Sequence, residues 1–408
     1  MSEPRPVAGA EGRRGDPVPD HPPPVTPAYD LHALRAREFP WAAAGESVYL
    51  NNASTGPLPE RTVTAVGEFT RLRAAPFRLG EELQFATVAR SRALCARLVG
   101  ARPENVALMV NTSYGINLAA RALPLPPGSV VLTFDREFPA NVYPWMALAA
   151  SRGVGLERIP VVHGLPDEEA LAARLARGGV SAVTLSWVSF ATGYRVDLAR
   201  IGALCREHGA FFVVDAIQGV GAVPLDAPAC GIDVLACGAQ KWLLSPWGTG
   251  FVYVRDGLIA QLAPHAVGWM SVRDSDDYSR MCEYDLTYRD DARRFEVVTL
   301  PYQDFAGLNA SLELLFELGV EAVAGHVASL AGRIVDWASD RNDVRLVTPA
   351  DAARRAGVVA LAPRDGRAAS ARLAGAGVAH SLREGAIRLS PHCYNTADEV
   401  DRALAALA

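Results

Sequence analysis

The segment "VVDAIQGVGAVPLDAPACGIDVLACGAQKWLLSPWGTGFVYV", residues 213–254, contains the most informative pattern in this chain. It includes most of three short apolar runs, "FFVVDA" (211–216), "IDVLAC" (232–237) and "GFVYV" (250–254). Runs that are apolar and β-branched at nearly every position are typical of strands buried on both faces. The segment therefore predicts a mostly parallel sheet covered by helices, which is an α/β fold.

The same alternation extends towards the N-terminus. "SVVLTF" (129–134) and "SAVTLSW" (181–187) predict two more buried strands. Residues 82–99 and 138–151 have helical patterns and separate the strands. We therefore expect one large domain over residues 59–305.

The C-terminal part of the chain predicts a smaller α+β domain over residues 306–408. Residues 310–340 suggest one or two long helices, and a final helix is expected near 397–407. Between them, "VRLVTP", "GVVALA" and "AIRLSP" are predicted to be strands.

Two further parts precede the large domain. Residues 1–27 are rich in Pro, Gly and Arg without apolar periodicity, which predicts a disordered tail. Order is expected to begin with a short helix capped by Asp30. We expect residues 28–58 to form an N-terminal segment that packs with the small domain.

The composition describes a globular protein of enzyme size. The chain has 408 residues, of which half are hydrophobic, and a net charge of −5, so nothing suggests nucleic acid or anionic membrane as a partner. The apolar runs are too short and too polar to span a bilayer, and no signal peptide is expected. Six scattered cysteines and eight dispersed histidines favour reduced thiols in the cytoplasm and no metal site.

Among 40 basic Lys and Arg residues, Lys241 is the only lysine. Chance could explain this, but a lysine can lose its proton at working pH and an arginine cannot. A neutral lysine amine can form a Schiff base with an aldehyde cofactor, of which pyridoxal 5'-phosphate (PLP) is the common one.

The sequence around Lys241 offers what PLP requires. Asp215, at a strand end, can keep the pyridine nitrogen protonated, and Gln218 can contact the phenolic oxygen. Thr112 and Ser113 open a helix, where backbone amides and hydroxyls bind phosphate. Taken singly, Asp215 could be a loop cap and the Thr-Ser pair only an N-cap.

The chain resembles the class V aminotransferase family, the fold-type I PLP enzymes that include cysteine desulfurases, kynureninases and isopenicillin N epimerase. The resemblance rests on residues 213–254 and on "YLNNASTGPLP" (49–59), "NTSYGINLAARAL", "REFPANVYPW" (136–145), "RFEVVTLPYQDFAGLNASLEL" (294–314) and "REGAIRLSPHCYNTADEVDRAL" (383–404). It covers nearly all of the chain after the tail and implies a PLP-binding large domain.

The resemblance also implies individual roles. Lys241 would be the Schiff-base lysine, and the other cofactor contacts would be Asp215, Gln218, Thr112, Ser113, Gln240, Phe138 and Thr299. Phe138 would stack on the pyridine ring. Thr299 would reach the phosphate of a neighbouring subunit, which implies a homodimer with shared active sites. The expected substrate contacts are Arg388, Asn52 and Tyr302. Arg388 would bind the α-carboxylate, although a solvated strand arginine is the alternative.

Several positions depart from the family pattern. Gln240 replaces a histidine found in many relatives, Gly238 replaces a hydroxyl residue, and Phe190 replaces an asparagine of desulfurases. The loop with the sulfur-accepting cysteine of desulfurases is also missing, and Cys393 is poorly placed to substitute for it. These departures disfavour a persulfide-forming desulfurase.

Several reactions at the α-carbon remain open. We favour β-elimination of a cysteine-derived conjugate by a carbon–sulfur lyase in specialised metabolism. Transamination is the next alternative, followed by decarboxylation-coupled deamination and by epimerisation. Epimerisation needs a second base, for which Tyr114, Tyr302 and His392 are candidates. A non-catalytic binding scaffold is disfavoured because Lys241 and Asp215 are both retained.

Overall fold

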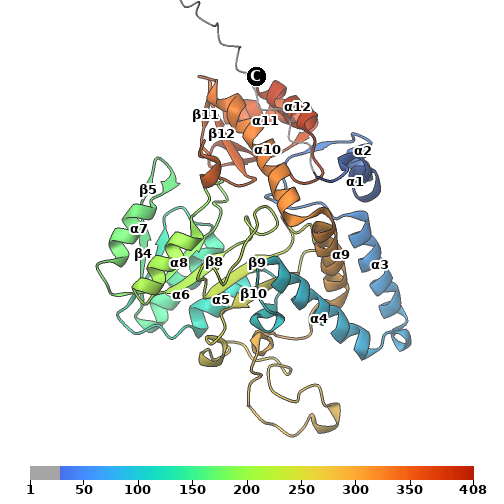
Figure 1. The fold of residues 1–408 in the computed structure, drawn as a ribbon, viewed down its shortest axis with the longest axis vertical. Helices are drawn as coiled ribbons and strands as arrows, with labels where there is room; N and C mark the ends of the chain where they lie inside the picture. Colours follow the sequence, from blue (N-terminus) through green and yellow to red (C-terminus); the bar gives the residue numbers. More distant parts are fainter. Residues whose placement is uncertain (1–27) are drawn as a thin grey trace, which may run out of the picture.

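The computed structural model describes residues 28–408, which form a large lower part and a smaller upper part that contains the C-terminus (Figure 1). The predicted disordered tail, residues 1–27, lies outside the described residues. The first helix, α1 (Leu31–Glu38), begins as expected, with the Asp30 side chain accepting a hydrogen bond from the Ala33 N–H.

Within the described residues, the large part is built on a seven-stranded sheet with mostly parallel strands. In spatial order the strands are β2 (Val106–Leu108), β10 (Gly250–Val254), β9 (Val234–Gly238), β8 (Phe211–Asp215), β7 (Val180–Ser186), β3 (Val130–Phe134) and β4 (Gly155–Ile159). Only β10 runs antiparallel to its neighbours in this sheet of the described chain. The predicted α/β class is confirmed.

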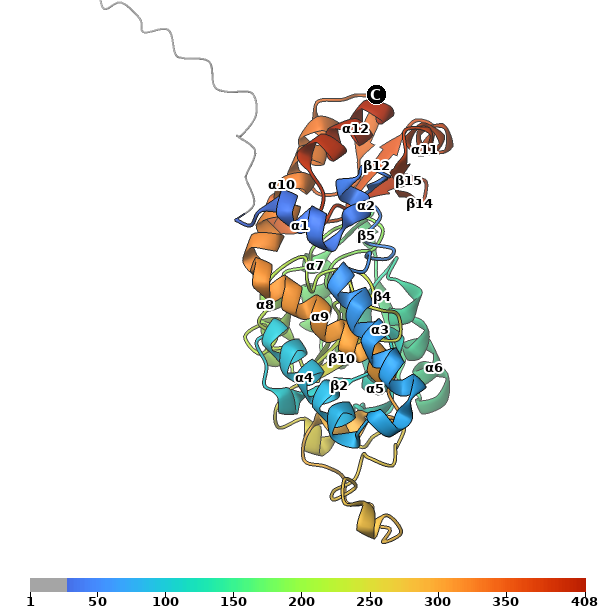
Figure 2. The ribbon, with the colours of Figure 1, turned by 90° about the vertical axis from the view of Figure 1, so that its right-hand side faces the viewer.

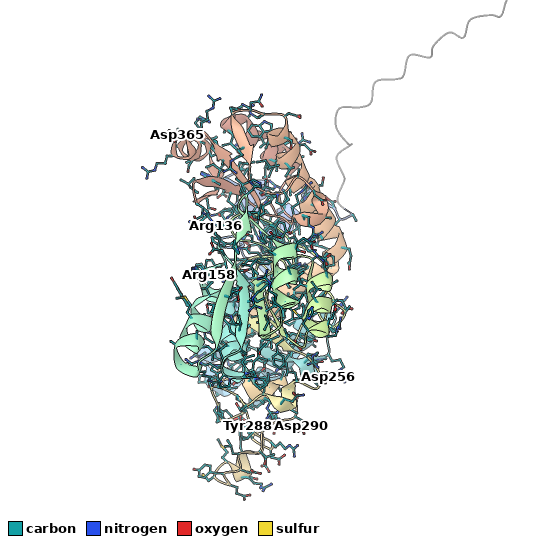
Figure 3. The ribbon with its side chains drawn as sticks, turned by 90° about the vertical axis from the view of Figure 1, so that its left-hand side faces the viewer. Arg136, Arg158, Asp256, Tyr288, Asp290 and Asp365 are labelled. Carbon is teal, nitrogen blue, oxygen red and sulfur yellow. The ribbon has the colours of Figure 1, made fainter. Side chains whose placement is uncertain are left out.

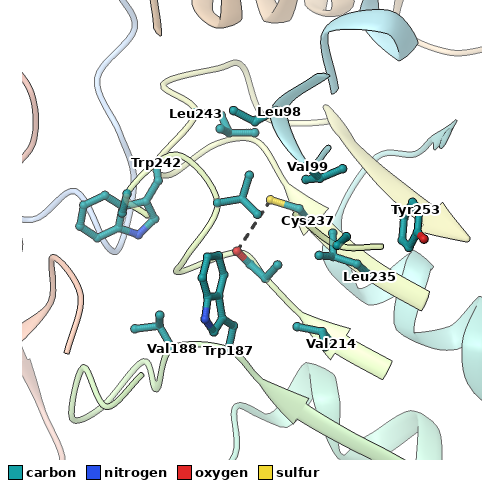
Figure 4. Packing of buried hydrophobic residues seen from close by; sticks show 14 of the residues in the cluster. Leu98, Val99, Trp187, Val188, Val214, Leu235, Cys237, Trp242, Leu243 and Tyr253 are labelled. Carbon is teal, nitrogen blue, oxygen red and sulfur yellow. Dashed lines mark hydrogen bonds between the residues drawn. The ribbon is translucent and has the colours of Figure 1, made fainter. Parts of the chain in front are cut away.

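Both faces of this sheet are buried, because successive side chains of the strands enter two different cores. Val213 packs with residues of α5 (Thr112–Ala122) and α6 (Tyr143–Arg152) on one face. Val214 packs on the other face, where the covering helices are α4 (Glu81–Leu98), α7 (Glu168–Leu175), α8 (Leu198–Glu207) and α9 (Tyr302–Leu318). Figure 4 shows this second core, which contains Cys237 and Leu235 of β9 together with Trp187 and Trp242.

The predicted strands of the large part lie within two residues of the observed ones, but β2 and β4 were not predicted. Strand β2 has only three residues, which is too short for a periodic pattern. Strand β4 has the sequence GLERI and lies at the edge of the sheet, so its charged residues mask the apolar signal.

The smaller part contains an antiparallel sheet whose strands, in spatial order, are β11 (Val344–Leu346), β12 (Val359–Pro363), β15 (Ala386–Leu389) and β14 (Ser381–Arg383). It packs with α10 (Val320–Ser339), α11 (Gly366–Gly375) and α12 (Ala397–Leu407). The predicted terminal helix matches α12.

The N-terminal segment lies against this smaller part. It contains α1, α2 (Pro40–Ala43) and β1 (Val48–Tyr49), and α3 (Glu60–Ala74) follows it. Strand β1 pairs in parallel with β13 (Val378–Ala379), and Arg35 of α1 forms a 2.8 Å ion pair with Glu399 of α12. These contacts join the N-terminal segment to the smaller part, and the bounds 28–58 stay a prediction.

Helices α9 and α10 connect the two parts, with a break at Gly319, whose φ of 85° suits glycine. Among residues 28–408, no single helix has the length and apolar composition to cross a membrane, although this bent pair, at 79°, meets both criteria when taken together. Between β10 and α9 a long segment projects away from the body of the molecule (Figure 2). A short antiparallel hairpin, β5 (Val161–Val162) and β6 (Leu165–Pro166), lies in a different region, directly after β4.

Candidate active site

Lys241 lies in the loop that leaves β9, and the N-terminal segment holds this loop in place. The Lys241 carbonyl accepts a hydrogen bond from Asn52 Nδ2 at 3.3 Å, and the Gln240 carbonyl accepts one from the Gly56 N–H at 2.8 Å. A β-carbon on Gly56 would stand 2.2 Å from the Lys241 carbonyl oxygen. Only glycine allows the two segments to approach so closely.

Asp215 ends β8 beside this loop and is buried, with 3% of its surface exposed. Burial raises the pKa of its carboxyl group to about 6, while a hydrogen bond from the Ile217 N–H and the charge of Lys241 oppose the rise. Burial also lowers the pKa of Lys241 to about 8, which Asp215 opposes. The pair therefore provides an amine that is partly neutral near pH 8. It also provides a buried carboxylate whose burial is opposed only by one backbone hydrogen bond and by the charge of Lys241.

Gln218 and Asn52 are buried and already engaged within the protein. Gln218 donates from Nε2 to the Ala53 carbonyl at 3.0 Å and accepts at Oε1 from the indole of Trp242 at 2.8 Å. Asn52 accepts at Oδ1 from the Tyr394 hydroxyl, besides donating to the lysine loop. Since an amide has two N–H groups, Gln218 keeps one donor for a ligand. Asn52 positions the loop that carries the lysine.

The N-terminus of α5 lies beside the end of β9. Thr112 is buried and its Oγ1 accepts a hydrogen bond from the Gly238 N–H at 2.9 Å, whereas Ser113 is exposed. A β-carbon at Gly238 would stand 2.6 Å from Gln240 Oε1, which is the end of a flexible side chain. Ser113 and the free N–H groups of the first turn therefore form the open anion-binding end of this 11-residue helix.

Two phenylalanines line the approach to Lys241. The Phe138 ring, 42% exposed, lies 5.8 Å from Lys241 Nζ, measured to the ring centroid. It contacts the Phe190 ring edge-to-face, with centroids 5.2 Å apart. Phe190, which departs from the desulfurase pattern, and Phe138 thus make an apolar wall together.

Arg388 of β15 is 3% exposed, so the alternative of a solvated strand arginine is wrong. Its guanidinium donates to the Ser381 and Ser54 hydroxyls and to the Phe190 carbonyl, at 3.0, 2.7 and 2.9 Å. Among the described residues no carboxylate lies within salt-bridge distance of it. Burial and the neighbouring Arg383 lower its pKa to about 10. A buried cation with only neutral partners is suited to an incoming anion.

Some residues expected at the site lie elsewhere in the protomer. Thr299 is exposed at the end of the projecting segment, and Tyr302 lines a separate cavity with Arg92 and Glu296. The Tyr114 hydroxyl donates to the Phe295 carbonyl and its ring lies against His265. Within one protomer, these residues are not brought together with Lys241.

His392 cannot be the second base, because it is fully buried. Its ring stacks between Trp242 and Tyr394. It accepts at Nδ1 from the Cys393 N–H, which leaves Nε2 to donate to the Trp242 carbonyl, and burial lowers its pKa to about 4. Cys393 is equally buried, so it is no sulfur acceptor, and burial raises the pKa of its thiol well above the usual range.

Sequence reasoning missed Glu137, whose carboxylate accepts hydrogen bonds from the N–H and the hydroxyl of Ser186 at 2.8 and 2.5 Å. Ser186 is the direct neighbour of Asp215 across strands β7 and β8. Burial raises the pKa of Glu137 to about 7, and the charge of Asp215 adds to the rise. The only signal in the sequence was the position of Glu137 directly before Phe138.

Within the described residues no cluster of ligands suits a metal ion.

The Aminotransferase class-V family model matches residues 48–403. The uncharacterised aminotransferase YcbU of Bacillus subtilis is 30% identical over 76% of this chain and 80% of its own length. The isopenicillin N epimerase of Streptomyces clavuligerus is 28% identical over 88% of this chain and 94% of its own. The structure of the cystine C–S lyase C-DES with its reaction product cysteine persulfide has a TM-score of 0.81 at 24% identity, covering 90% and 98% of the two chains.

Proposed function

The chain belongs to the class V aminotransferase family, whose members are PLP-dependent enzymes, and on this premise we propose that it is a carbon–sulfur lyase. The proposed substrate is an L-amino acid derived from cysteine, with a thioether or disulfide at the β-carbon. The observation that carries the proposal is the buried, carboxylate-free Arg388 near Lys241, combined with a two-residue turn, Glu384–Gly385, where desulfurases have a cysteine loop.

The residues of the site fit PLP. Lys241 is the only lysine able to bind the aldehyde, and Asp215 lacks a cationic partner other than Lys241. Ser113 and the first turn of α5 offer donors to a phosphate, and Gln218 retains one N–H. When bound, PLP supplies an electron sink that makes the bonds at the substrate α-carbon easier to break.

The chain's own residues would bind the substrate and move its protons. Arg388 would hold the α-carboxylate through two parallel hydrogen bonds, which orients the α-carbon near Lys241. Lys241 Nζ, with a pKa of about 8, is suited to remove and return a proton at neutral pH. Phe138 contributes an apolar face that carries no titratable group.

The net reaction is redox-neutral and balanced. The α-carbon–hydrogen bond and the β-carbon–sulfur bond break, and the sulfur leaves with the bonding electron pair and takes up a proton. Addition of one water to the remaining three-carbon fragment releases pyruvate and ammonium. No residue needs to accept sulfur, which agrees with the burial of Cys393 and with the short turn after β14.

Elimination is favoured over epimerisation by the surroundings of Lys241. Among the described residues, the second-base candidates Tyr114 and His392 are hydrogen-bonded elsewhere, so neither is placed to act opposite Lys241. The relative C-DES, described as a cystine C–S lyase, is a precedent for carbon–sulfur cleavage on this fold. We place the reaction in specialised metabolism as part of the same proposal.

We also propose a homodimer. The projecting segment before α9 exposes large apolar side chains, among them Trp269, Tyr284 and Leu286, which are 43, 92 and 68% exposed. Thr299 follows this segment and is exposed, as a residue that serves a neighbouring subunit would be. Apolar exposure of this kind marks an interaction surface.

The test is a substrate panel with separate assays for pyruvate, ammonia, keto acids and carbon dioxide. Purified enzyme with PLP should release pyruvate, ammonium and thiol in equal amounts from at least one cysteine S-conjugate. Conversion of an amino acid to its keto acid with a second keto acid as acceptor would replace the proposal by transamination. Carbon dioxide released in step with turnover would replace it by decarboxylation-coupled deamination.

A further inference from the structure

A cavity of about 550 Å³ lies between the two parts of the molecule, beside the site described above. It is bounded by the segment after β3, by the turn after β7, by the β5–β6 hairpin and by the turn between β14 and β15. Arg136, in this lining, lies where the smaller part meets the larger one (Figure 3). The volume of the cavity suits a whole small molecule and is far larger than the volume of a cysteine side chain.

The cavity borders the expected substrate position at the two phenylalanines. Phe138 and Phe190 both line it, and Phe138 also lies 5.8 Å from Lys241 Nζ. The Phe190 carbonyl accepts from Arg388. A substrate held by its α-carboxylate at Arg388, with its α-carbon near Lys241, therefore has its side chain directed past these rings into the cavity.

The charges of the cavity do not balance. Arg136 lies 3.8 Å from Glu384, and Asp135 lies 3.4 Å from Arg158, so these four groups are paired. The carboxylate of Glu137 is held by Ser186, and burial raises its pKa to about 7, which weakens its negative charge.

Two arginines of the lining are left over. The side chains of Arg345 in β11 and Arg383 in β14 form no ion pair or hydrogen bond with any other part of the described chain. Both side chains are exposed, and both come from the smaller part of the molecule. The cavity thus joins an apolar side, at Phe138 and Phe190, to a side with two arginines that the smaller part contributes.

We propose that the substrate side chain ends in a second anionic group, a carboxylate or its equivalent, bound by Arg383 and Arg345. The proposal rests on the proposed function, because Arg388 and Lys241 fix the other end of the substrate. The substrate class is a cysteine S-conjugate with an apolar linker of a few atoms beyond sulfur and a terminal acid. The linker packs between Phe138 and Phe190, and the acid lies against the two free arginines.

The test measures equilibrium binding to the PLP-loaded enzyme by isothermal titration calorimetry. The probes are α-methyl-S-(2-carboxyethyl)-L-cysteine and its terminal amide, which have the same size and lack the α-hydrogen. Wild-type enzyme should bind the acid about tenfold or more tightly than the amide. The double variant Arg345→Gln/Arg383→Gln should reduce this preference to about threefold or less. The control Arg367→Gln, at an exposed arginine of α11 away from the cavity, should keep it.

The possible failures are distinguishable. If acid and amide bind equally, the second anionic group is excluded while the proposed function stands. If the double variant weakens both probes to the same extent, the two arginines bind the α-carboxylate instead, which also overturns the proposal. If neither probe binds and no cysteine conjugate is cleaved, the proposed function fails together with it. Because both arginines are exposed, unfolding of the double variant is not expected, and its melting temperature checks this.

Discussion

Arg388 of the C-terminal sheet donates a 2.9 Å hydrogen bond to the carbonyl of Phe190 in the large part of the molecule. The bond crosses from one part to the other and ties the expected carboxylate-binding residue to the apolar wall of the site. The Phe190 ring in turn contacts Phe138, which lies beside Lys241. If Arg388 binds the substrate carboxylate as proposed, one guanidinium group couples substrate binding to the position of the two parts.

Lys241 should be the only residue that PLP modifies stably. Borohydride reduction of the PLP-loaded protein, followed by peptide mapping, should place the label on Lys241, since the chain has no other lysine side chain. Lys241→Ala should remain unlabelled under the same conditions. An unlabelled wild-type protein would contradict PLP binding through this residue.

The pH dependence of PLP capture should report the lowered pKa of Lys241. Only the neutral amine attacks an aldehyde, so the capture rate of cofactor-free protein should rise with pH and level off above about 8 rather than near 10.5. In Asp215→Asn the midpoint should move lower still, because the carboxylate that favours the charged amine is gone. Stopped-flow absorbance measures both curves, and a wild-type midpoint near 10 would refute the assignment.

Asp215→Asn should make the cofactor-free protein more stable at pH 8 while it lowers the turnover of the PLP-loaded enzyme. Burial raises the folded pKa of Asp215 from 3.8 to about 6, so its ionised form destabilises the cofactor-free protein above pH 6 by an amount on the order of 2–3 kcal/mol. The variant should therefore have a higher melting temperature than the wild type at pH 8. This gain should shrink as the pH falls through about 6, where the native carboxyl group becomes protonated.

The same variant should lose turnover by orders of magnitude, because its side chain cannot hold a proton on the pyridine nitrogen. Calorimetry of cofactor-free protein and steady-state kinetics of loaded protein measure the two effects. Near wild-type turnover in Asp215→Asn would show that the reaction does not depend on that charge.

Arg388→Ala should raise KM at least about tenfold, since a charge-assisted bidentate pair is lost from a buried site. Arg388→Lys should recover little, because an ammonium group cannot reproduce the planar fork. Arg364→Ala, at an exposed arginine, is the matched control and should leave KM unchanged. An unaltered KM in Arg388→Ala would reject the carboxylate assignment.

Gly56→Ala should displace the lysine loop. The new methyl group would stand 2.2 Å from the Lys241 carbonyl oxygen, a backbone atom that cannot rotate away. We expect a lower melting temperature and weaker PLP retention on gel filtration. Gly67→Ala is the control, because its methyl group meets nothing closer than 4.0 Å and a helical alanine should stabilise α3 by about 0.5–1 kcal/mol. Equal behaviour of the two variants would refute this role of Gly56.

Much of the fold was accessible from the sequence alone. The buried strands of the large part repeat short apolar runs, so β3, β7, β8, β9 and β10 were predicted within two residues. Local sequence also singled out Lys241 and Asp215 as candidate site residues, because a lone amine and a carboxylate at a strand end are chemical signals that do not depend on distant contacts. Strands β2 and β4 were missed, since their sequences are too short or too polar to show a period.

The tertiary structure alone decided which polar residues are free to act. His392 and Arg388 lie four residues apart and are both buried, yet His392 is satisfied by backbone groups while Arg388 faces only neutral partners. Glu137 lies beside Asp215 only because β7 and β8 are neighbours, and Arg383 and Arg345 share a cavity only because β11 and β14 belong to one sheet. Burial and charge pairing depend on contacts between residues far apart in the chain, so no local pattern could reveal them.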